Sequence, residues 1–367
     1  MTQDLRADQR STPIDHHPLL AIWELTQACD LACVHCRACA VSGRDPLELS
    51  TDEGKRLLDS VCAMGTPLMI LTGGDPAKRD DLVELVRHGA SIGLVMAVTP
   101  SGTGLMTRQL LQELKDAGMA RLAVSIDGPD AATHDAFRRV DGSFAHCLRI
   151  LEDAKELGIE RQVNTTLGPH NHHALAPMAA MVQGLGAVLW SVFSVVPVGR
   201  ADTALMITPD ERERALEELA VIAMVAPFDV KTTAAPHFRR ILMEKHAKGH
   251  ALGVLRDLDE DGKVKGPRGV NDGVGMFFVS HRGEVYPSGF LPISAGNVRR
   301  GSLASMYREG PLFRALRDVG PTEGKCSVCP FIRVCSGSRA RAYAMEGRID
   351  ASDPACAYVP KSWYGNG

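Results

Sequence analysis

The chain has 367 residues, of which 45% are hydrophobic, 23% charged and 5% aromatic, and its formal net charge is -3 at pH 7. This composition is that of a folded globular protein and excludes extensive disorder. Charged residues of both signs are interspersed along the sequence and form no broad basic region, so we expect neither nucleic acid nor an anionic membrane surface as a partner.

The chain begins with a polar segment, residues 1–17. Its first ten residues lack the apolar core of a secretory signal, and no apolar run in the sequence reaches the length of a membrane span. We therefore expect a cytoplasmic protein. In a reducing compartment, ten cysteines are more naturally metal ligands or buried thiols than disulfides.

Short β-rich runs alternate with segments of helical period from residue 18 onward. This alternation is typical of parallel strands joined by crossover helices. Capping signals at Ser50–Glu53 and Thr208–Glu211 mark the starts of two of the helices. Six strand-helix units are predicted, with strands at 19–26, 67–72, 92–98, 120–127, 159–166 and 187–196.

The alternation ends near residue 230. The stretch 256–275 is rich in Gly, Asp, Lys and Pro, which indicates a long loop or insertion. A hairpin is predicted over 276–287, with its turn at His281–Gly283, and a helix near 302–317. We therefore expect a barrel over 18–230, a linker or insertion over 231–275 and a further domain over 276–367.

A first cysteine group, Cys29, Cys33 and Cys36, directly follows the first predicted strand. Parallel α/β barrels place catalytic groups at that end of a strand. Three thiolates in this CxxxCxxC spacing can bind three irons of a 4Fe-4S cubane and leave the fourth iron open to a ligand. A closed zinc site that includes His35 is the alternative.

The remaining cysteines of the N-terminal half are expected to play other roles. Cys39 would close the open iron if it were a fourth ligand, so we assign it to packing or substrate contact. Cys62 and Cys147 lie within helical patterns and are predicted to be buried thiols.

The stretch from Trp23 to Arg37 resembles the cluster loop of radical SAM enzymes, and the resemblance continues over almost the whole chain. It implies a partial (β/α)6 TIM-like barrel, a 4Fe-4S cluster and S-adenosylmethionine (SAM). In that family, reductive cleavage of SAM gives methionine and a 5'-deoxyadenosyl radical, which abstracts a hydrogen atom from the substrate. A flavodoxin-type or ferredoxin-type electron donor is implied as a partner.

The resemblance also implies a SAM pocket. The segment Gly73-Gly74-Asp75-Pro76 resembles the family's GGEP motif, which binds the methionyl amino group, with Asp in place of Glu. Taken alone, such a segment is often only a turn. Ser125 and Asp127 match the family's SxDG motif near SAM, which is a weak signal when taken alone. Arg138 and Asn164 also match family positions near SAM, with a solvated charge or a strand-end cap as the alternative for each. After the third strand, the family's usual Thr-Asn-Gly reads Thr99-Pro100-Ser101-Gly102 here.

A second cysteine group lies near the end of the chain and consists of Cys326, Cys329, Cys335 and Cys356. Four thiolates make a complete ligand set for a second, auxiliary 4Fe-4S cluster, and a structural zinc ion is the alternative. The surrounding sequence, 324–356, resembles the SPASM extension of radical SAM enzymes that modify peptides or tetrapyrroles.

Full SPASM domains hold two auxiliary clusters, and this sequence departs from them. Ser288, Ser338, Ala234 and Val270 stand where relatives carry cysteines, and no cysteine lies between Cys147 and Cys326. We therefore predict that the auxiliary cluster near the barrel is missing and that only the distal one is built.

The overall likeness is to the radical SAM enzymes of haem biosynthesis, which implies modification of a tetrapyrrole side chain. One alternative is a SPASM-type maturase of a ribosomally synthesised peptide. The other is a non-enzymatic iron-sulfur electron carrier, although a carrier has no use for a SAM pocket. In the tetrapyrrole interpretation, six residues are candidates to contact propionates or iron, with solvated loop residues as the alternative: His237, Arg239, Arg240, His281, Arg282 and Tyr286.

Overall fold

The structure is a computed structural model that describes residues 14–249, 269–318 and 323–363. Within these residues ten strands form one sheet, in the order β10-β9-β8-β1-β2-β3-β4-β5-β6-β7. The strands are β1 (Leu20–Glu24), β2 (Leu68–Thr72), β3 (Val95–Val98), β4 (Met119–Ser125), β5 (Glu160–Leu167), β6 (Leu189–Ser194), β7 (Asp229–Thr233), β8 (Met276–Val279), β9 (Glu284–Tyr286) and β10 (Gly296–Asn297).

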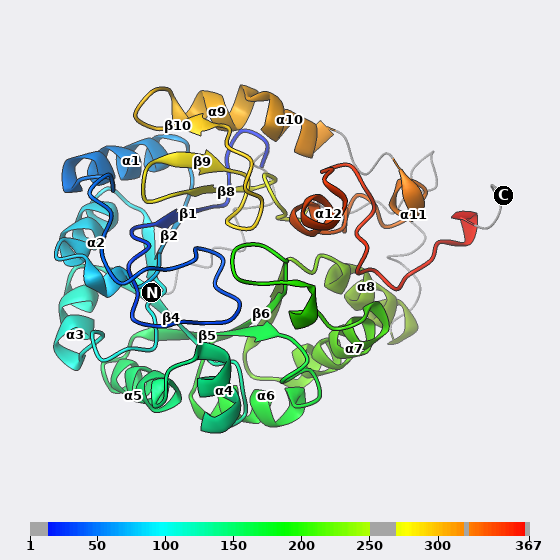
Figure 1. Cartoon of the computed structure of the whole chain (residues 1–367), viewed down its shortest axis with the longest axis horizontal. Coiled ribbons are helices and arrows are strands. Elements are labelled where there is room, and N and C mark those ends of the chain that lie inside the picture. Colours follow the sequence, from blue (N-terminus) through cyan, green and yellow to red (C-terminus); the bar gives the residue numbers. More distant parts are fainter. Residues whose placement is uncertain (1–13, 250–268, 319–322, 364–367) are drawn as a thin grey trace.

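Helices follow most of the strands and surround the curved sheet (Figure 1). They are α1 (Thr51–Ala63), α2 (Leu82–Ser91), α3 (Arg108–Asp116), α4 (Ala131–Arg138), α5 (Ser143–Glu156), α6 (Leu175–Gly184), α7 (Pro209–Val225), α8 (His237–Gly249), α9 (Leu303–Glu309), α10 (Pro311–Asp318), α11 (Gly324–Ser327) and α12 (Arg339–Glu346), with 3-10 turns η1 (Pro76–Lys78), η2 (Thr203–Leu205) and η3 (Lys361–Trp363). None of the described helices is long and apolar enough to span a membrane.

The strands β8 and β1 to β7 all run parallel to one another. Each crossover helix covers the outer face of the sheet, so the carboxyl ends of these strands meet at one edge of the barrel. The predicted fold class, a partial α/β barrel with a C-terminal extension, is confirmed. All six predicted strands are present as β1 to β6.

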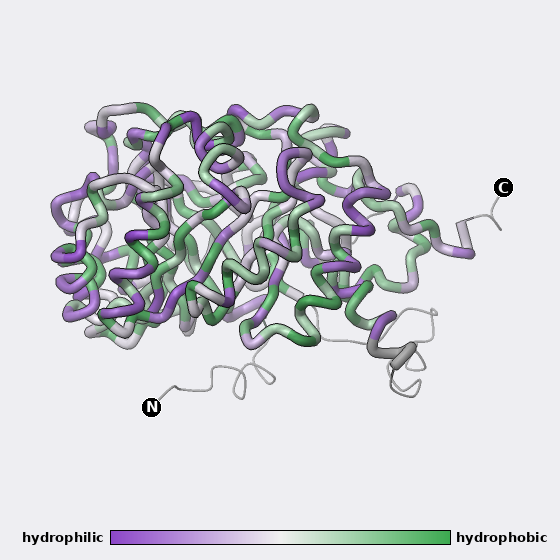
Figure 2. The backbone as a smooth tube through the Cα atoms, turned by 90° about the horizontal axis from the view of Figure 1, so that it is seen from below, coloured by the Kyte–Doolittle hydropathy of each residue, from purple (hydrophilic) through white to green (hydrophobic). Residues whose placement is uncertain are grey.

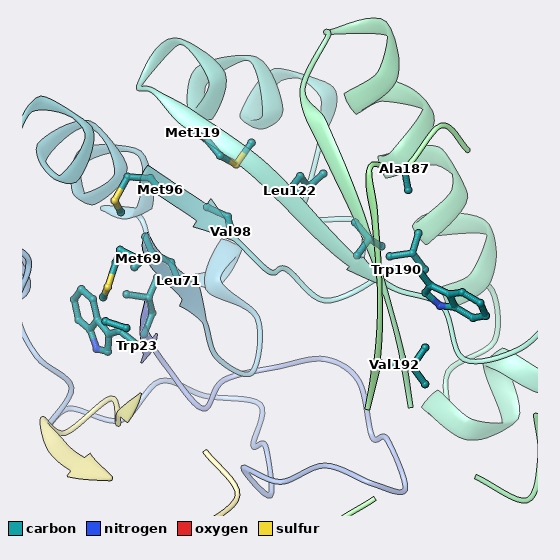
Figure 3. Close-up of a cluster of buried hydrophobic side chains, with 14 of the residues drawn as sticks. Trp23, Met69, Leu71, Met96, Val98, Met119, Leu122, Ala187, Trp190 and Val192 are labelled. Atoms are coloured by element: carbon teal, nitrogen blue, oxygen red, sulfur yellow. The ribbon is translucent and has the colours of Figure 1, made fainter. Parts of the chain in front are cut away.

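The main hydrophobic core lies between the sheet and its helices, and it includes Trp23, Met69, Met96 and Trp190, which are fully buried. Figure 3 shows Trp23, Met69 and Met96 on the neighbouring strands β1, β2 and β3, and Trp190 farther along the sheet on β6. Hydrophobic segments run through the interior of the molecule, and hydrophilic segments lie mostly at its margin (Figure 2). Burial of this layer supplies the main driving force that holds helices to sheet.

Three features of the fold differ from the sequence analysis. The strand β7 lies largely within the predicted linker. It is an edge strand that pairs with β6 alone among the described strands, and its sequence, DVKTT, lacks the apolar alternation by which a strand is predicted. The helix α8 also begins in that linker. The predicted helix at 302–317 is two helices, α9 and α10, because Pro311 cannot continue the hydrogen-bonding of α9.

The C-terminal segment joins the same sheet as the barrel. The predicted hairpin is present, with β8 and β9 antiparallel, and β8 pairs in parallel with β1. At the turn, Gly283 has φ +85°, a backbone conformation that favours glycine. The domain boundaries remain a prediction, and residues 1–13 of the N-terminal segment and 250–268 of the predicted loop lie outside the described residues.

Replacement of Gly54 tests how tightly α1 packs on the sheet. An added Cβ would lie 2.5 Å from the Trp23 ring and 2.9 Å from Leu85. We expect Gly54→Ala to lower the free energy of unfolding by about 1–3 kcal/mol, because the ring cannot move within a filled core. The measurement is urea-induced unfolding followed by circular dichroism.

The control is Gly184→Ala at the end of α6, where an added Cβ meets nothing within 4 Å. This variant should be as stable as the wild type or slightly more stable, since alanine is the better helix former. Equal stability of both variants would contradict the close packing of α1 on Trp23.

Candidate functional site

A cavity of about 640 Å³ lies inside the curved sheet, at the level of the carboxyl ends of its parallel strands. Its volume falls in the range of small-molecule and cofactor sites. Eight of the residues singled out from the sequence line it: Cys29, Cys33, Cys36, Gly73, Gly74, Ser125, Arg138 and Asn164. The structure therefore brings residues separated by more than a hundred positions in the chain to one site.

The first cysteine group lies on the loop that follows β1. The Cys29 amide donates to the Val41 carbonyl (2.8 Å), which pins the two ends of the loop together. The Cys29 and Cys33 side chains are buried, and burial raises the pKa of both thiols. Nearby donors oppose this effect: Ser101 Oγ is 3.2 Å from Cys29 Sγ, and an Arg138 nitrogen is 3.8 Å from Cys33 Sγ.

The glycine turn after β2 is packed directly against the cysteine loop. The Gly74 amide donates to the Thr26 carbonyl (2.7 Å), and the next amide donates to the Ala28 carbonyl (2.7 Å). A Cβ on Gly73 would lie 2.6 Å from the Thr26 carbonyl oxygen, and one on Gly74 would lie 2.6 Å from that of Gln27. Only glycine permits this approach of the two backbones. The turn thus leaves its own backbone open to the cavity beside the thiols.

Asp75 is fully buried and lies outside the cavity wall. One carboxylate oxygen accepts from Thr103 Oγ1 (2.7 Å), and the other accepts from the Ala77 amide (3.1 Å) and caps η1. In this arrangement the Asp75 side chain, which is shorter than the Glu of the family motif, stabilises the glycine turn from the side away from the cavity. Burial raises the pKa of Asp75, and these hydrogen bonds oppose the shift.

Ser101 links the glycine turn to the cysteine loop. Its hydroxyl donates to the Gly74 carbonyl (2.6 Å) and is also within reach of Cys29 Sγ. The sequence marked this position only as a departure from a family motif. The contact depends on how β3 is placed beside β2, which no local pattern reveals.

Asp127 and Arg138 form a buried ion pair that connects the end of β4 to the end of α4. Arg138 Nε donates to the Asp127 carboxylate (2.7 Å), and the Thr166 amide donates to the other oxygen (2.6 Å). Burial alone would raise the pKa of Asp127, but the Arg138 guanidinium lowers it to about 2. Arg138 lines the cavity while Asp127 does not, so the carboxylate positions the guanidinium near Cys33.

His35 is part of an aromatic stack between the cysteine loop and the barrel. Its ring lies 4.3 Å from that of Phe137, which lies 4.0 Å from that of His170. Burial lowers the pKa of His35 to about 3, with the charge of Arg138 contributing, so the ring is neutral at pH 7. This stack fixes the middle of the cysteine loop.

The other cysteines of this half lie apart from the cavity. Cys39 is exposed and is absent from the cavity wall, so its surroundings give it neither a packing role nor a place in the pocket. Cys147 is buried in α5 and Cys62 is partly buried in α1, in agreement with the prediction of structural thiols. Among the described residues, no group of three or more His, Cys, Asp or Glu side chains is arranged to hold a single metal ion.

The second cysteine group is gathered around α11, at the far end of the molecule from α1 (Figure 1). Burial raises the pKa of Cys335, and the charges of Cys356, Cys326 and Cys329 contribute to the rise. A shared cluster of these four cysteines stays a prediction.

Arg341 forms a buried ion pair with Asp353 inside the C-terminal segment and connects this segment to the barrel by hydrogen bonds. Arg341 Nη2 lies 2.9 Å from the carboxylate, and the same guanidinium donates to the carbonyls of Val195 and Ala234. Burial opposes ionisation, but Arg341 lowers the pKa of Asp353 well below its usual range. His237 is buried against the same carboxylate at 3.3 Å, so it does not face the cavity.

Three of the four residues that the sequence analysis matched to cysteines of the SPASM extension line the cavity: Ala234, Val270 and Ser288. Ser288 Oγ donates to Asp272, whose other oxygen accepts from the Ala340 amide (2.9 Å). Ser338 is fully buried and caps α12. The polar pair of Ser288 and Asp272 thus lies in the cavity wall.

Of the six residues considered for contact with propionates or iron, Arg239 lines the cavity. The other five lie outside its wall. His281 is held by Glu24 (2.8 Å). Arg240 and Arg282 form ion pairs with Glu213 and Asp45. Two further cations of the wall were given no role in the sequence analysis: Arg37, which ends the stretch that resembles the cluster loop, and Lys231, which lies in no motif.

Comparison with known proteins agrees with this site. A family model described as the Radical SAM superfamily matches residues 23–182. An AdoMet-dependent heme synthase from Oleidesulfovibrio alaskensis is 40% identical over 344 residues, which cover 93% of this chain and 88% of that protein. An Fe-coproporphyrin III synthase from Methanosarcina barkeri is 29% identical, over 96% of this chain and 90% of that protein.

The fold is also similar to that of solved structures. The crystal structure of Streptococcus suis SuiB bound to precursor peptide SuiA has a TM-score of 0.73, with 14% identity over 94% of this chain and 78% of that one. At this identity the likeness concerns the fold alone.

The ion pair of Asp127 and Arg138 can be tested by a double-mutant cycle. Each single replacement, Asp127→Asn or Arg138→Met, leaves the partner buried and unpaired, so we expect each to lower the free energy of unfolding by about 3–5 kcal/mol. Because the pKa of Asp127 is about 2, its carboxylate is ionised and its contribution is complete at pH 7.

The double variant should lose clearly less than the sum of the two single variants, since it leaves no lone charge. The measurement is urea-induced unfolding of all four proteins at pH 7. If the loss of unfolding free energy in the double variant equals the sum of the two single losses to within about 0.5 kcal/mol, the two groups do not interact.

Proposed function

The chain belongs to the radical SAM superfamily, and on that premise we propose that it modifies a side chain of a tetrapyrrole haem precursor. It is a radical SAM enzyme, and enzymes of this family use a 4Fe-4S cluster and SAM. The observation that carries the proposal is one cavity, of about 640 Å³, which contains the three clustered thiols, the glycine turn and an extensive apolar wall. A mobile electron carrier needs no such enclosed space.

We assign the SAM-binding cluster to Cys29, Cys33 and Cys36. The fit rests on the donor set, three thiols on one loop, and on the glycine turn that exposes backbone beside them. Bound together, the reduced cluster and SAM supply a 5'-deoxyadenosyl radical that abstracts a hydrogen atom from the substrate. Arg138 places its positive charge near Cys33 and thereby favours the thiolate form of that ligand.

The remaining pocket residues are assigned by their place in the cavity. Gly73, Gly74, Ser125 and Asn164 line it and are proposed to bind SAM. Asp75 and Asp127 lie behind the wall, so we assign them supporting roles, with Asp75 bracing the glycine turn and Asp127 orienting Arg138.

We assign a second 4Fe-4S cluster to Cys326, Cys329, Cys335 and Cys356, with structural zinc as the alternative. The assignment is supported by the charges of Cys356, Cys326 and Cys329, which contribute to the raised pKa of Cys335, and by Arg341, whose hydrogen bonds connect the segment to the barrel. A flavodoxin-type or ferredoxin-type protein is the proposed electron donor.

The choice of a tetrapyrrole over a peptide rests on the relatives and on the cavity. The similarity to an AdoMet-dependent heme synthase extends over nearly the whole chain. The cavity wall combines apolar side chains, such as Ile22, Ile70 and Phe278, with a few cations, which suits an apolar ring that carries carboxylates. A ribosomally synthesised peptide is the second candidate, because the fold resembles that of SuiB.

Turnover of iron coproporphyrin III tests the proposed function. We expect the anaerobically reduced protein to form 5'-deoxyadenosine from SAM in a substrate-dependent reaction and to change the mass of the tetrapyrrole, as measured by mass spectrometry. The control is the variant in which Cys29, Cys33 and Cys36 are all alanine, which should do neither. Formation of 5'-deoxyadenosine that responds to a precursor peptide and not to the tetrapyrrole would favour the peptide alternative.

Iron and sulfide content, together with Mössbauer spectra, tests the two cluster assignments. We expect about eight irons per chain in the wild type and about four in the triple alanine variant, because each assigned cluster is a four-iron cubane. A Cys39→Ala variant should keep all of them, since Cys39 is exposed outside the cavity wall.

Two other results would contradict these assignments. About four irons with one zinc ion would give the C-terminal group a structural role. About twelve irons would mean that residues other than cysteine support a cluster near Ser288 and Asp272.

A further inference from the structure

We propose that Lys231 binds a carboxylate of the substrate inside the barrel cavity and thereby determines which part of the substrate faces the SAM site. The inference rests on the proposed function, because it names the substrate group that this residue recognises. The alternative is a lysine that only keeps an edge strand soluble.

Strand register places Lys231 in the same row as the SAM pocket. Ser125 on β4 pairs with Asn164 on β5, Asn164 pairs with Ser191 on β6, and Ser191 pairs with Lys231 on β7. Side chains in register lie on the same face of a sheet, and Ser125, Asn164 and Lys231 all line the cavity. Neighbouring strands are about 4.8 Å apart, so the backbone of Lys231 is about 10 Å from that of Asn164.

Lys231 and the cysteine loop reach the cavity from different strands. In the sheet order, β7 is six strands from β1, which carries that loop at its end. Both contribute to one cavity because the sheet curves back toward itself (Figure 1). A substrate between them would have one end at Lys231 and another at the proposed SAM site.

The other cations of the cavity wall already have partners. Arg37 is paired with Glu24 (2.7 Å), and Arg138 is paired with Asp127. Arg239 donates to the carbonyls of Val334 and Val270. Lys231, by contrast, makes no hydrogen bond or ion pair with any of the described residues, and its register partner is an uncharged serine.

The Lys231 side chain is exposed, and it lies in the wall of the cavity. The barrel around it lowers the pKa of Lys231 to about 8 by desolvation, and the positive charge of Arg121, which is itself paired with Glu160, contributes. Next to it, Val230 and Phe193 add apolar wall. A carboxylate that pairs with the ammonium would offset this desolvation, and the attraction is stronger in such a setting than in water.

The chemistry of a haem precursor matches this site. Its ring is largely apolar and its propionates are carboxylates, so it offers both an apolar body for the wall and an anion for Lys231. A substrate without a carboxylate would leave the ammonium unpaired and would bind less well. Lys231 therefore acts as a positioning residue that selects for an anionic side chain.

Binding of iron coproporphyrin III to the cluster-loaded, SAM-bound protein tests the inference. The affinity is measured anaerobically by the change in the porphyrin absorption. We expect Lys231→Gln to weaken binding at least about tenfold at pH 7, since it removes a charge from an enclosed pair. Lys155→Gln, on the exposed face of α5, is the matched control and should bind as the wild type does.

Two further measurements separate a charge contact from a structural effect. The fully esterified methyl ester of the porphyrin should bind equally to the wild type and to Lys231→Gln, because it offers no carboxylate. Lys231→Arg should restore most of the affinity for the free acid. Iron content and circular dichroism show whether each variant is folded and loaded.

The pH dependence gives an independent readout. The ammonium is the binding form, so wild-type affinity should be steady below the pKa of about 8 and should fall as the pH rises above it. Lys231→Gln should lack this fall, and so should Lys231→Arg, whose guanidinium stays charged. The nearby charges of Arg121 and Glu160 do not titrate in this range.

If the wild type binds iron coproporphyrin III and Lys231→Gln binds it with an affinity within twofold of the wild type, the inference is overturned and the proposed function stays intact. Loss of binding of the free acid and of the ester to the same extent would also overturn it, because the effect would then be structural. Failure of the wild type to bind iron coproporphyrin III would overturn the proposed function and the inference together.

Discussion

The parallel pairing of β8 and β1 to β7 is the constraint on which the rest of the site depends. Since all these strands run in one direction, every loop that follows a strand emerges at the same edge of the barrel. The cysteine loop after β1, the glycine turn after β2 and Ser101 after β3 are therefore neighbours in space. Two backbone hydrogen bonds from the glycine turn then hold the cysteine loop in place.

Two buried ion pairs hold further elements of the site in place. Asp127 and Arg138 connect β4 to α4 and direct a positive charge at Cys33, while Arg341, paired with Asp353, connects the C-terminal segment to the end of β6. A lone buried charge is far more costly than a buried pair. Each pair therefore fixes its two elements relative to one another, and the position of a proposed cofactor ligand follows from the position of its neighbours.

Three groups of side chains with different proposed roles line the same cavity. The proposed cluster and SAM residues, the cation Lys231 and the polar pair of Ser288 and Asp272 all line it. In our assignment the side chains of Ser288 and Asp272 bind no iron.

The sequence by itself determined the strands β1 to β6, the two cysteine groups and the glycine turn, because periodic apolar patterns and closely spaced motifs are local properties of a chain. Tertiary structure alone decided which groups face the cavity. Asp75 and Asp127 are turned behind the wall, since local amides, Thr103 and Arg138 already satisfy their oxygens. Lys231 enters the cavity through the register of β6 and β7, in a short edge strand whose sequence carries no apolar pattern that could reveal it.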